Sequence, residues 1–154
     1  MDFNRLLRVV RLCIKLHLNR FFTRSIYYRM FKKSIAIIDD DPDLLNLFSE
    51  ALQMSGYTVS SFTDPLLAYQ HIQENADKYS LVIVDEKIFN LNGLFSSTRL
   101  LEVNPKLNII LLSNFKDSKY NYKFNILKKR VSIFKLISAV NDSISKSISH
   151  ENKL

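Results

Sequence analysis

Apolar runs and helix-like patterns alternate along the chain from residue 34 onward. Residues 35–38 and 81–84 are apolar at every position, which is typical of strands buried on both faces of a parallel sheet. Between them, leucine and phenylalanine recur at spacings of three and four over residues 44–52, as on one side of an amphipathic helix. The alternation predicts an α/β domain whose parallel sheet is covered by helices.

Turn residues set the remaining boundaries. Asp41-Pro42 and Asp64-Pro65 each supply an N-cap followed by a proline at the first helical position, and Gly56 is a natural stop for the first helix. We expect five strands and a doubly wound sheet, with strands at residues 35–38, 57–62, 81–84, 107–112 and 125–127. Helices are expected over residues 42–55, 66–75, about 94–104 and 132–148. Only 14 residues separate Ser113 from Lys128, so the fourth helix is predicted to be shortened to two turns at most.

Polar side chains follow four of the predicted strands. Asp39 and Asp40 come after the first strand, Asp85 after the third, Ser113 after the fourth and Lys128 after the fifth. Ligands of an open parallel sheet collect at the carboxyl ends of its strands. The sequence therefore predicts that these side chains meet at one site.

The predicted site suits a divalent cation and an anion. Three carboxylates placed together repel one another, and a cation with oxygen ligands relieves that repulsion. Mg²⁺ fits because it needs few carboxylates and keeps several waters. The set suits phosphoryl transfer to a carboxylate, with Asp85 as nucleophile, Asp39 and Asp40 on the metal, and Ser113 and Lys128 on the anion's oxygens.

Two simpler interpretations of these residues are open. Asp39 and Asp40 could serve only as capping acids, although Asp41 already takes the N-cap position. Lys128 belongs to the run Lys-Lys-Arg at residues 128–130, which could be a solvated charge run.

These residues carry a resemblance to a known family. Ile-Ile-Asp-Asp-Asp-Pro ending at Pro42, Val-Ile-Val-Asp85 with Gly93 eight residues on, Leu-Leu-Ser113 and Ile-Leu-Lys128 follow one another in this order. Over residues 34–147 the chain resembles the receiver domain of two-component response regulators, which implies a flavodoxin-like receiver fold.

The resemblance also implies a role for each site residue. Asp85 is then the phosphoacceptor, supplied by a histidine kinase or a phosphotransfer protein. Asp39, Asp40 and Asp85, together with the backbone carbonyl of Lys87, are then the ligands of the Mg²⁺ cofactor. Ser113 is then the switch hydroxyl and Lys128 its phosphate-binding partner.

Three positions depart from the family's pattern. The family usually has proline four residues after the phosphorylated aspartate, where this chain has Phe89, and proline after its lysine, where Lys129 follows Lys128. The aromatic residue that moves on activation would lie near Asn125, after the shortened fourth helix. These departures put signal transmission in question more than phosphorylation.

The expected function is that of a stand-alone receiver in a phosphorelay, signalling to a downstream protein by contact. It is not an enzyme in the usual sense, although it would catalyse its own phosphorylation and dephosphorylation. The alternative is a non-switching pseudo-receiver that acts as a protein interaction module. A Mg²⁺-dependent phosphatase of similar topology would need an acid two residues after Asp85, and that position is Lys87.

Charge divides the chain into two parts. The whole chain has a formal charge of +7. Residues 1–33 hold nine basic residues and one acidic residue, so they carry a net +8, while residues 34–154 hold 13 basic and 14 acidic residues and net −1. We therefore predict a basic extension at 1–33, a receiver domain at 34–148 and a polar tail at 149–154, and we expect no nucleic-acid partner for the nearly neutral body.

The basic extension is open to three interpretations. Its pattern describes a basic amphipathic helix, which is able to contact an anionic membrane surface or a partner. Its arginine-rich, acid-poor composition also resembles a transit peptide. The third interpretation is that translation begins at Met30, so that the extension is not native.

Cysteine usage and hydropathy bear on location. Cys13 is the single cysteine, so no intramolecular disulfide forms, and the absence of cysteine after it suits a reducing compartment. The most apolar stretch, residues 6–22, is interrupted by basic residues and falls short of a membrane span. We expect a cytoplasmic protein.

Overall fold

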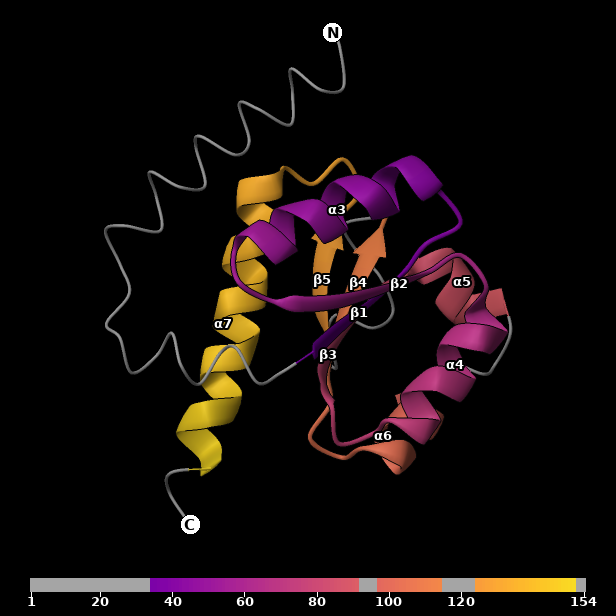
Figure 1. The fold of residues 1–154 in the computed structure, drawn as a ribbon, viewed down its shortest axis with the longest axis vertical. Helices are drawn as coiled ribbons and strands as arrows, with labels where there is room; N and C mark the ends of the chain where they lie inside the picture. Colours follow the sequence, from indigo (N-terminus) through magenta and orange to yellow (C-terminus); the bar gives the residue numbers. More distant parts are fainter. Residues whose placement is uncertain (1–33, 92–96, 115–123, 152–154) are drawn as a thin grey trace, which may run out of the picture.

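The fold is built on one five-stranded parallel sheet (Figure 1). A computed structural model describes residues 34–91, 97–114 and 124–151. The strands are β1 (Ser34–Ile38), β2 (Thr58–Phe62), β3 (Tyr79–Asp85), β4 (Asn108–Ser113) and β5 (Asn125–Lys128), in the order β2-β1-β3-β4-β5. The order reverses between β1 and β3, and at such a reversal an open α/β sheet forms a crevice for ligands.

Helices cover both faces of the sheet (Figure 1). They are α3 (Pro42–Met54), α4 (Pro65–Glu74), α5 (Glu86–Leu91), α6 (Ser97–Val103) and α7 (Ile133–Glu151). Helices α3 and α7 pack on one face, and α4, α5 and α6 contribute to the core on the other. The predicted doubly wound α/β class is confirmed.

Successive strand residues alternate between the two cores. In β1, Ile35 and Ile37 belong to the core under α3 and α7, whereas Ala36 and Ile38 belong to the core under α4, α5 and α6. All four are fully buried. The continuous apolar runs of the sequence therefore reflect strands packed on both sides, as predicted.

The predicted helix boundaries are confirmed at the two Asp-Pro sites. The Asp41 carboxylate accepts hydrogen bonds from the backbone N–H groups of residues 43 and 44, at 3.0 and 3.1 Å. Asp64 does the same for residues 66 and 67. Helix α3 ends at Met54, and Gly56 follows with φ of 93°, a left-handed conformation that glycine adopts without steric cost.

One helix differs from the prediction. Residues 86–91 form the short helix α5 directly after β3, where the sequence pattern gave no helix. The Asp85 carboxylate accepts a hydrogen bond from the Lys87 backbone N–H at 2.7 Å, as an N-cap side chain does for the first turn of a helix. The strand therefore passes straight into a helix at the site.

Some predictions concern residues that the structure does not describe. They include the basic extension at 1–33, the loop at Asn92 and Gly93, and the shortened fourth helix within 115–123. No helix of the described part of the chain combines the length and the apolar character needed to cross a membrane.

Candidate functional site

The site lies at the carboxyl ends of β1 and β3. Asp39 follows β1 and is fully buried, and Asp85 ends β3 with 4% of its surface exposed. In the sheet register Ile37 lies beside Ile83, so two residues further along Asp39 and Asp85 continue the same pair of positions. Both carboxylates therefore lie on the α3 and α7 side of the sheet edge.

Asp40 completes a cluster of three carboxylates. An oxygen atom from each of Asp39, Asp40 and Asp85 lies within 4.8 Å of the others. Asp40 is exposed, whereas the other two are buried. The sequence prediction that these three acids meet at one site is confirmed.

Lys129 is the cation that the structure places inside this cluster. Its Nζ contacts Asp85 Oδ2 and lies 3.3 Å from Asp39 Oδ2. The sequence prediction named Lys128 for this position, and the structure corrects it: Lys128 ends β5 with an exposed side chain. The residue after the lysine that contacts the acids is therefore Arg130, not Lys129.

Strand alternation explains the correction. Leu127 of β5 is buried in the core under α3 and α7, the face on which Asp39 and Asp85 lie. Side chains two residues apart in a strand share a face, so Lys129 follows Leu127 onto that side while Lys128 points to the other. A backbone hydrogen bond of 2.5 Å from Lys129 N–H to the Ser113 carbonyl extends the pairing of β4 and β5 to this residue.

Burial and neighbouring charges act on both partners. Burial raises the pKa of Asp39, while the Asp41 N–H at 3.0 Å and the Lys129 ammonium oppose that rise. Burial alone would lower the pKa of Lys129, but its contacts with Asp85 and Asp39 outweigh this and raise it. Lys129 is therefore firmly protonated, and it partly neutralises the buried acids.

Lys87 supplies a second positive charge, at the rim of the cluster. It lies in the first turn of α5, and its Nζ is 3.7 Å from Asp40 Oδ2. Both side chains are mostly exposed, at 69% and 60%. This pair is screened by water and contributes little stability.

Ser113 lies at the end of β4 and is fully buried. Its Oγ donates a hydrogen bond to Glu86 Oε2, from the first residue of α5. The predicted switch hydroxyl is therefore at the predicted strand end, and the structure adds an acidic partner that sequence reasoning missed. The signal was available in Glu86 itself, an acid next to the candidate nucleophile.

The remaining sequence expectations concern the positions that bear on signal transmission. Asn125, where an aromatic residue was expected, is exposed, while its neighbour Phe124 packs against the core under α4, α5 and α6. Phe89 lies within α5.

Family comparison agrees with the fold. Residues 35–151 match the family described as the response regulator receiver domain. The protein belongs to this family, as the sequence resemblance indicated.

Two curated relatives illustrate the range of proteins to which this chain is similar. The response regulator receiver protein CpdR of Brucella abortus is 30% identical over 83 residues, which make up 54% of this chain and 68% of CpdR. The C4-dicarboxylate transport transcriptional regulatory protein DctD of Rhizobium meliloti is 33% identical over 84 residues, 54% of this chain but only 18% of DctD. The similarity is therefore to a receiver segment, which occurs both in a short protein and in a much longer one.

Solved structures share the fold. A response regulator receiver domain protein from Clostridium thermocellum superposes with a TM-score of 0.66 at 23% identity, covering 74% of this chain and 95% of that one. A CheY-like response regulator receiver domain protein from Methanospirillum hungatei superposes with a TM-score of 0.65 at 20% identity. The match covers 77% of this chain and 98% of that one. The five-stranded receiver fold is thus common to this chain and these proteins.

Proposed function

We propose that this receiver domain accepts a phosphoryl group on Asp85 in a Mg²⁺-dependent reaction. The observation that carries the proposal is the position of Asp85, a buried carboxylate with an oxygen within 4.8 Å of oxygens of two further acids and in contact with the Lys129 ammonium. An Asp85 oxygen attacks the phosphorus of the donor, an acyl phosphate forms, and the bond to the donor's leaving group breaks. The ionised carboxylate needs no base to remove a proton.

The donor set fits Mg²⁺. Asp39, Asp40 and Asp85 offer three carboxylate oxygens within 4.8 Å of one another, which is the hard-oxygen chemistry that Mg²⁺ prefers. The Lys87 backbone carbonyl is the proposed fourth protein ligand. When bound, Mg²⁺ supplies positive charge that neutralises the phosphoryl oxygens.

In this proposal, Lys129 and Ser113 bind the remaining oxygens of the phosphoryl group. Lys129 already contacts the Asp85 oxygen, so its ammonium is placed to follow negative charge as it moves to the phosphoryl group. The Lys87 backbone N–H, 2.7 Å from Asp85 Oδ1, is a further donor at the same carboxylate. The Ser113 hydroxyl donates to a phosphoryl oxygen once it leaves Glu86.

Incubation with Mg²⁺ and a small phosphodonor tests the proposal. We expect intact-protein mass spectrometry to show one added phosphate in the wild type and none in Asp85→Asn. Asp77→Asn, which changes an exposed acid at a turn, is the control and should be phosphorylated normally. A wild-type chain that stays folded and unmodified would overturn the proposal.

The partners follow from the same chemistry. A histidine kinase or a phosphotransfer protein would supply the phosphate, and a downstream protein would read the phosphorylated state. We propose a cytoplasmic location, because residues 34–154 contain no cysteine and suit a reducing compartment. We propose further that the receiver domain acts alone rather than within a longer regulator, and the mass of the intact protein from its natural source tests this.

A non-switching interaction module is the second candidate. The observation that favours it is Arg130, which follows the active lysine with φ of 62°, where the family usually has proline. Binding of the downstream partner that is equal for wild type and Asp85→Asn, with and without phosphodonor, would favour this candidate over a switch.

A further inference from the structure

Glu86 and Ser113 meet because β3 and β4 end beside each other. Asp85, the last residue of β3, pairs with Leu112 of β4 in the sheet register. Glu86, which begins α5, and Ser113, which ends β4, are the next residue along each segment. The Ser113 Oγ then donates its hydrogen bond to Glu86 Oε2.

This contact determines what the hydroxyl is able to do. A serine hydroxyl has a single hydrogen to donate, and here that hydrogen is directed at the Glu86 carboxylate. A phosphoryl group on Asp85 would need the same hydrogen, and it would also bring negative charge close to Glu86. Glu86 therefore opposes the phosphorylated state by competition for Ser113 and by charge repulsion.

Burial alone does not require this pairing. Ser80, in β3, is also buried, and its Oγ has no hydrogen-bond partner among the described residues. The fold thus tolerates an unpaired serine hydroxyl in the same sheet. The acidic partner of Ser113 is a specific feature of the site edge.

We propose that Glu86 is a positioning residue that holds Ser113 in the resting state and so restrains phosphorylation of Asp85. The inference rests on the proposed phosphoacceptor function and deepens it. When the Glu86 carboxylate moves aside, the Ser113 hydroxyl becomes available to the phosphoryl group, so displacement of Glu86 is part of the activating change.

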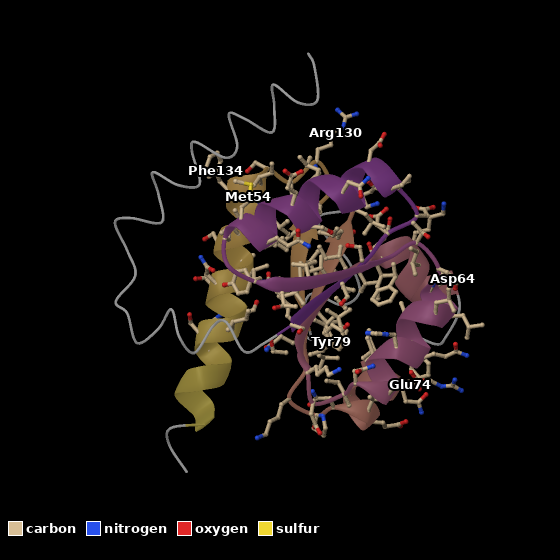
Figure 2. All side chains as sticks on the ribbon, viewed as in Figure 1. Met54, Asp64, Glu74, Tyr79, Arg130 and Phe134 are labelled. Carbon is tan, nitrogen blue, oxygen red and sulfur yellow. The ribbon has the colours of Figure 1, made fainter. Side chains whose placement is uncertain are left out.

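Charge removal at Glu86 is the first experiment. Glu86→Gln keeps the shape of the side chain, and we expect the rate of Asp85 phosphorylation by Mg²⁺ and a small phosphodonor to rise about fivefold, as loss of about 1 kcal/mol of repulsion would give. Glu74→Gln is the matched control. Glu74 ends α4 at the end opposite Asp64 (Figure 2), about 15 Å of helix away from the carboxyl edge of the sheet, and its variant should react at the wild-type rate.

A double variant separates the two effects of Glu86. If Glu86 acts through Ser113, the rise caused by Glu86→Gln should be smaller in a Ser113→Ala background than in the wild type. An equal rise in both backgrounds would overturn the positioning role and leave only a charge effect.

A second readout does not depend on phosphorylation. The side-chain carboxyl carbon of Glu86, observed by NMR without Mg²⁺ or phosphodonor, should shift in Ser113→Ala and stay unchanged in Ser145→Ala, an exposed position of α7. An unchanged signal in Ser113→Ala would overturn the contact.

The outcomes keep the two proposals apart. Phosphate on no variant overturns the phosphoacceptor function, and the restraining role with it, even if the NMR shift is present. Phosphorylation of the wild type and Glu86→Gln at equal rates overturns only the restraining role.

Discussion

At the scale of single residues, the site depends on which lysine reaches the acids. Lys128 and Lys129 are adjacent and chemically identical, yet one is exposed and the other contacts Asp39 and Asp85. The sequence showed that a lysine follows the last strand. It did not show which face of the sheet each lysine shares with the aspartates, because that depends on the burial of Leu127.

Lys129→Met and Lys128→Met should therefore differ in stability. Lys129→Met leaves two buried carboxylates without their cation, and we expect the free energy of unfolding at pH 7 to fall by about 2 kcal/mol. Lys128→Met should change it by less than about 0.5 kcal/mol. Urea unfolding followed by circular dichroism measures both, and equal losses would contradict the assignment of Lys129.

The raised pKa of Lys129 gives the sign of the pH dependence. A group whose folded-state pKa lies above its unfolded value contributes stability that is present below the unfolded value and is lost as pH rises through the folded one. As the pH is raised from neutrality, the difference between wild type and Lys129→Met should therefore begin to shrink only above pH 10.5.

The Asp39 carboxylate lowers the stability of the folded protein at neutral pH, whereas Lys129 raises it. Burial raises its pKa, so its contribution to stability is present below pH 3.8 and is lost as pH rises through the folded pKa. In EDTA, Asp39→Asn should be more stable than wild type at pH 7 by about 1 kcal/mol, and the difference should vanish near pH 3. Unfolding curves at the two pH values check this, and Asp43→Asn, an exposed acid of α3, is the control.

Lys87 is expected to compete with a divalent cation for the Asp40 carboxylate. Its ammonium lies 3.7 Å from Asp40 Oδ2, and the exposed pair is worth less than about 1 kcal/mol. Lys87→Gln should therefore raise Mg²⁺ affinity by about threefold in isothermal titration calorimetry. Lys78→Gln, which changes an exposed lysine just before β3, at the end of that strand opposite Asp85, should leave the affinity unchanged.

At the scale of elements, local signals were sufficient for most boundaries. Asp41-Pro42, Asp64-Pro65 and Gly56 act on neighbouring backbone groups only, so their effect is visible in the sequence and was confirmed. Helix α5 was missed because it has only six residues and no apolar repeat of its own. It forms where the Asp85 side chain caps its first turn.

The cap of α4 offers a test at this scale. Asp64 Oδ1 accepts hydrogen bonds from the N–H groups of residues 66 and 67 at 2.7 and 3.2 Å, and Figure 2 shows it at the start of the helix. Asp64→Ala should lower the free energy of unfolding by about 1 kcal/mol. Asp77→Ala, at an exposed turn, should have little effect, and equal losses in both variants would argue against the cap.

At the scale of the whole molecule, contacts distant in sequence join the layers. The Tyr57 hydroxyl, at the entrance to β2, donates a hydrogen bond of 2.5 Å to Asn141 Oδ1 on α7, across 84 positions of sequence. Tyr57 is 4% exposed, and its burial raises the pKa of the hydroxyl well above its usual value, so it stays a donor throughout the working range of pH.

Tyr57→Phe tests how much this link contributes. The ring stays in the core, but the half-buried Asn141 oxygen loses its donor, so the free energy of unfolding should fall by about 1 kcal/mol. The same substitution in an Asn141→Ala background is the comparison and should cost less, because the acceptor is already absent there. An equal loss in both backgrounds would show that the hydrogen bond contributes nothing measurable.

The sequence by itself determined the α/β class, the five strands, the two Asp-Pro caps and the meeting of Asp39, Asp40 and Asp85 at one edge. Each of these follows from patterns within a few residues, together with the rule that parallel strands end at a common edge. Only the tertiary structure decided that Lys129 faces the acids and that Glu86 holds Ser113. Both depend on contacts between residues 27 to 90 positions apart in sequence, which only the packing of the strands brings together.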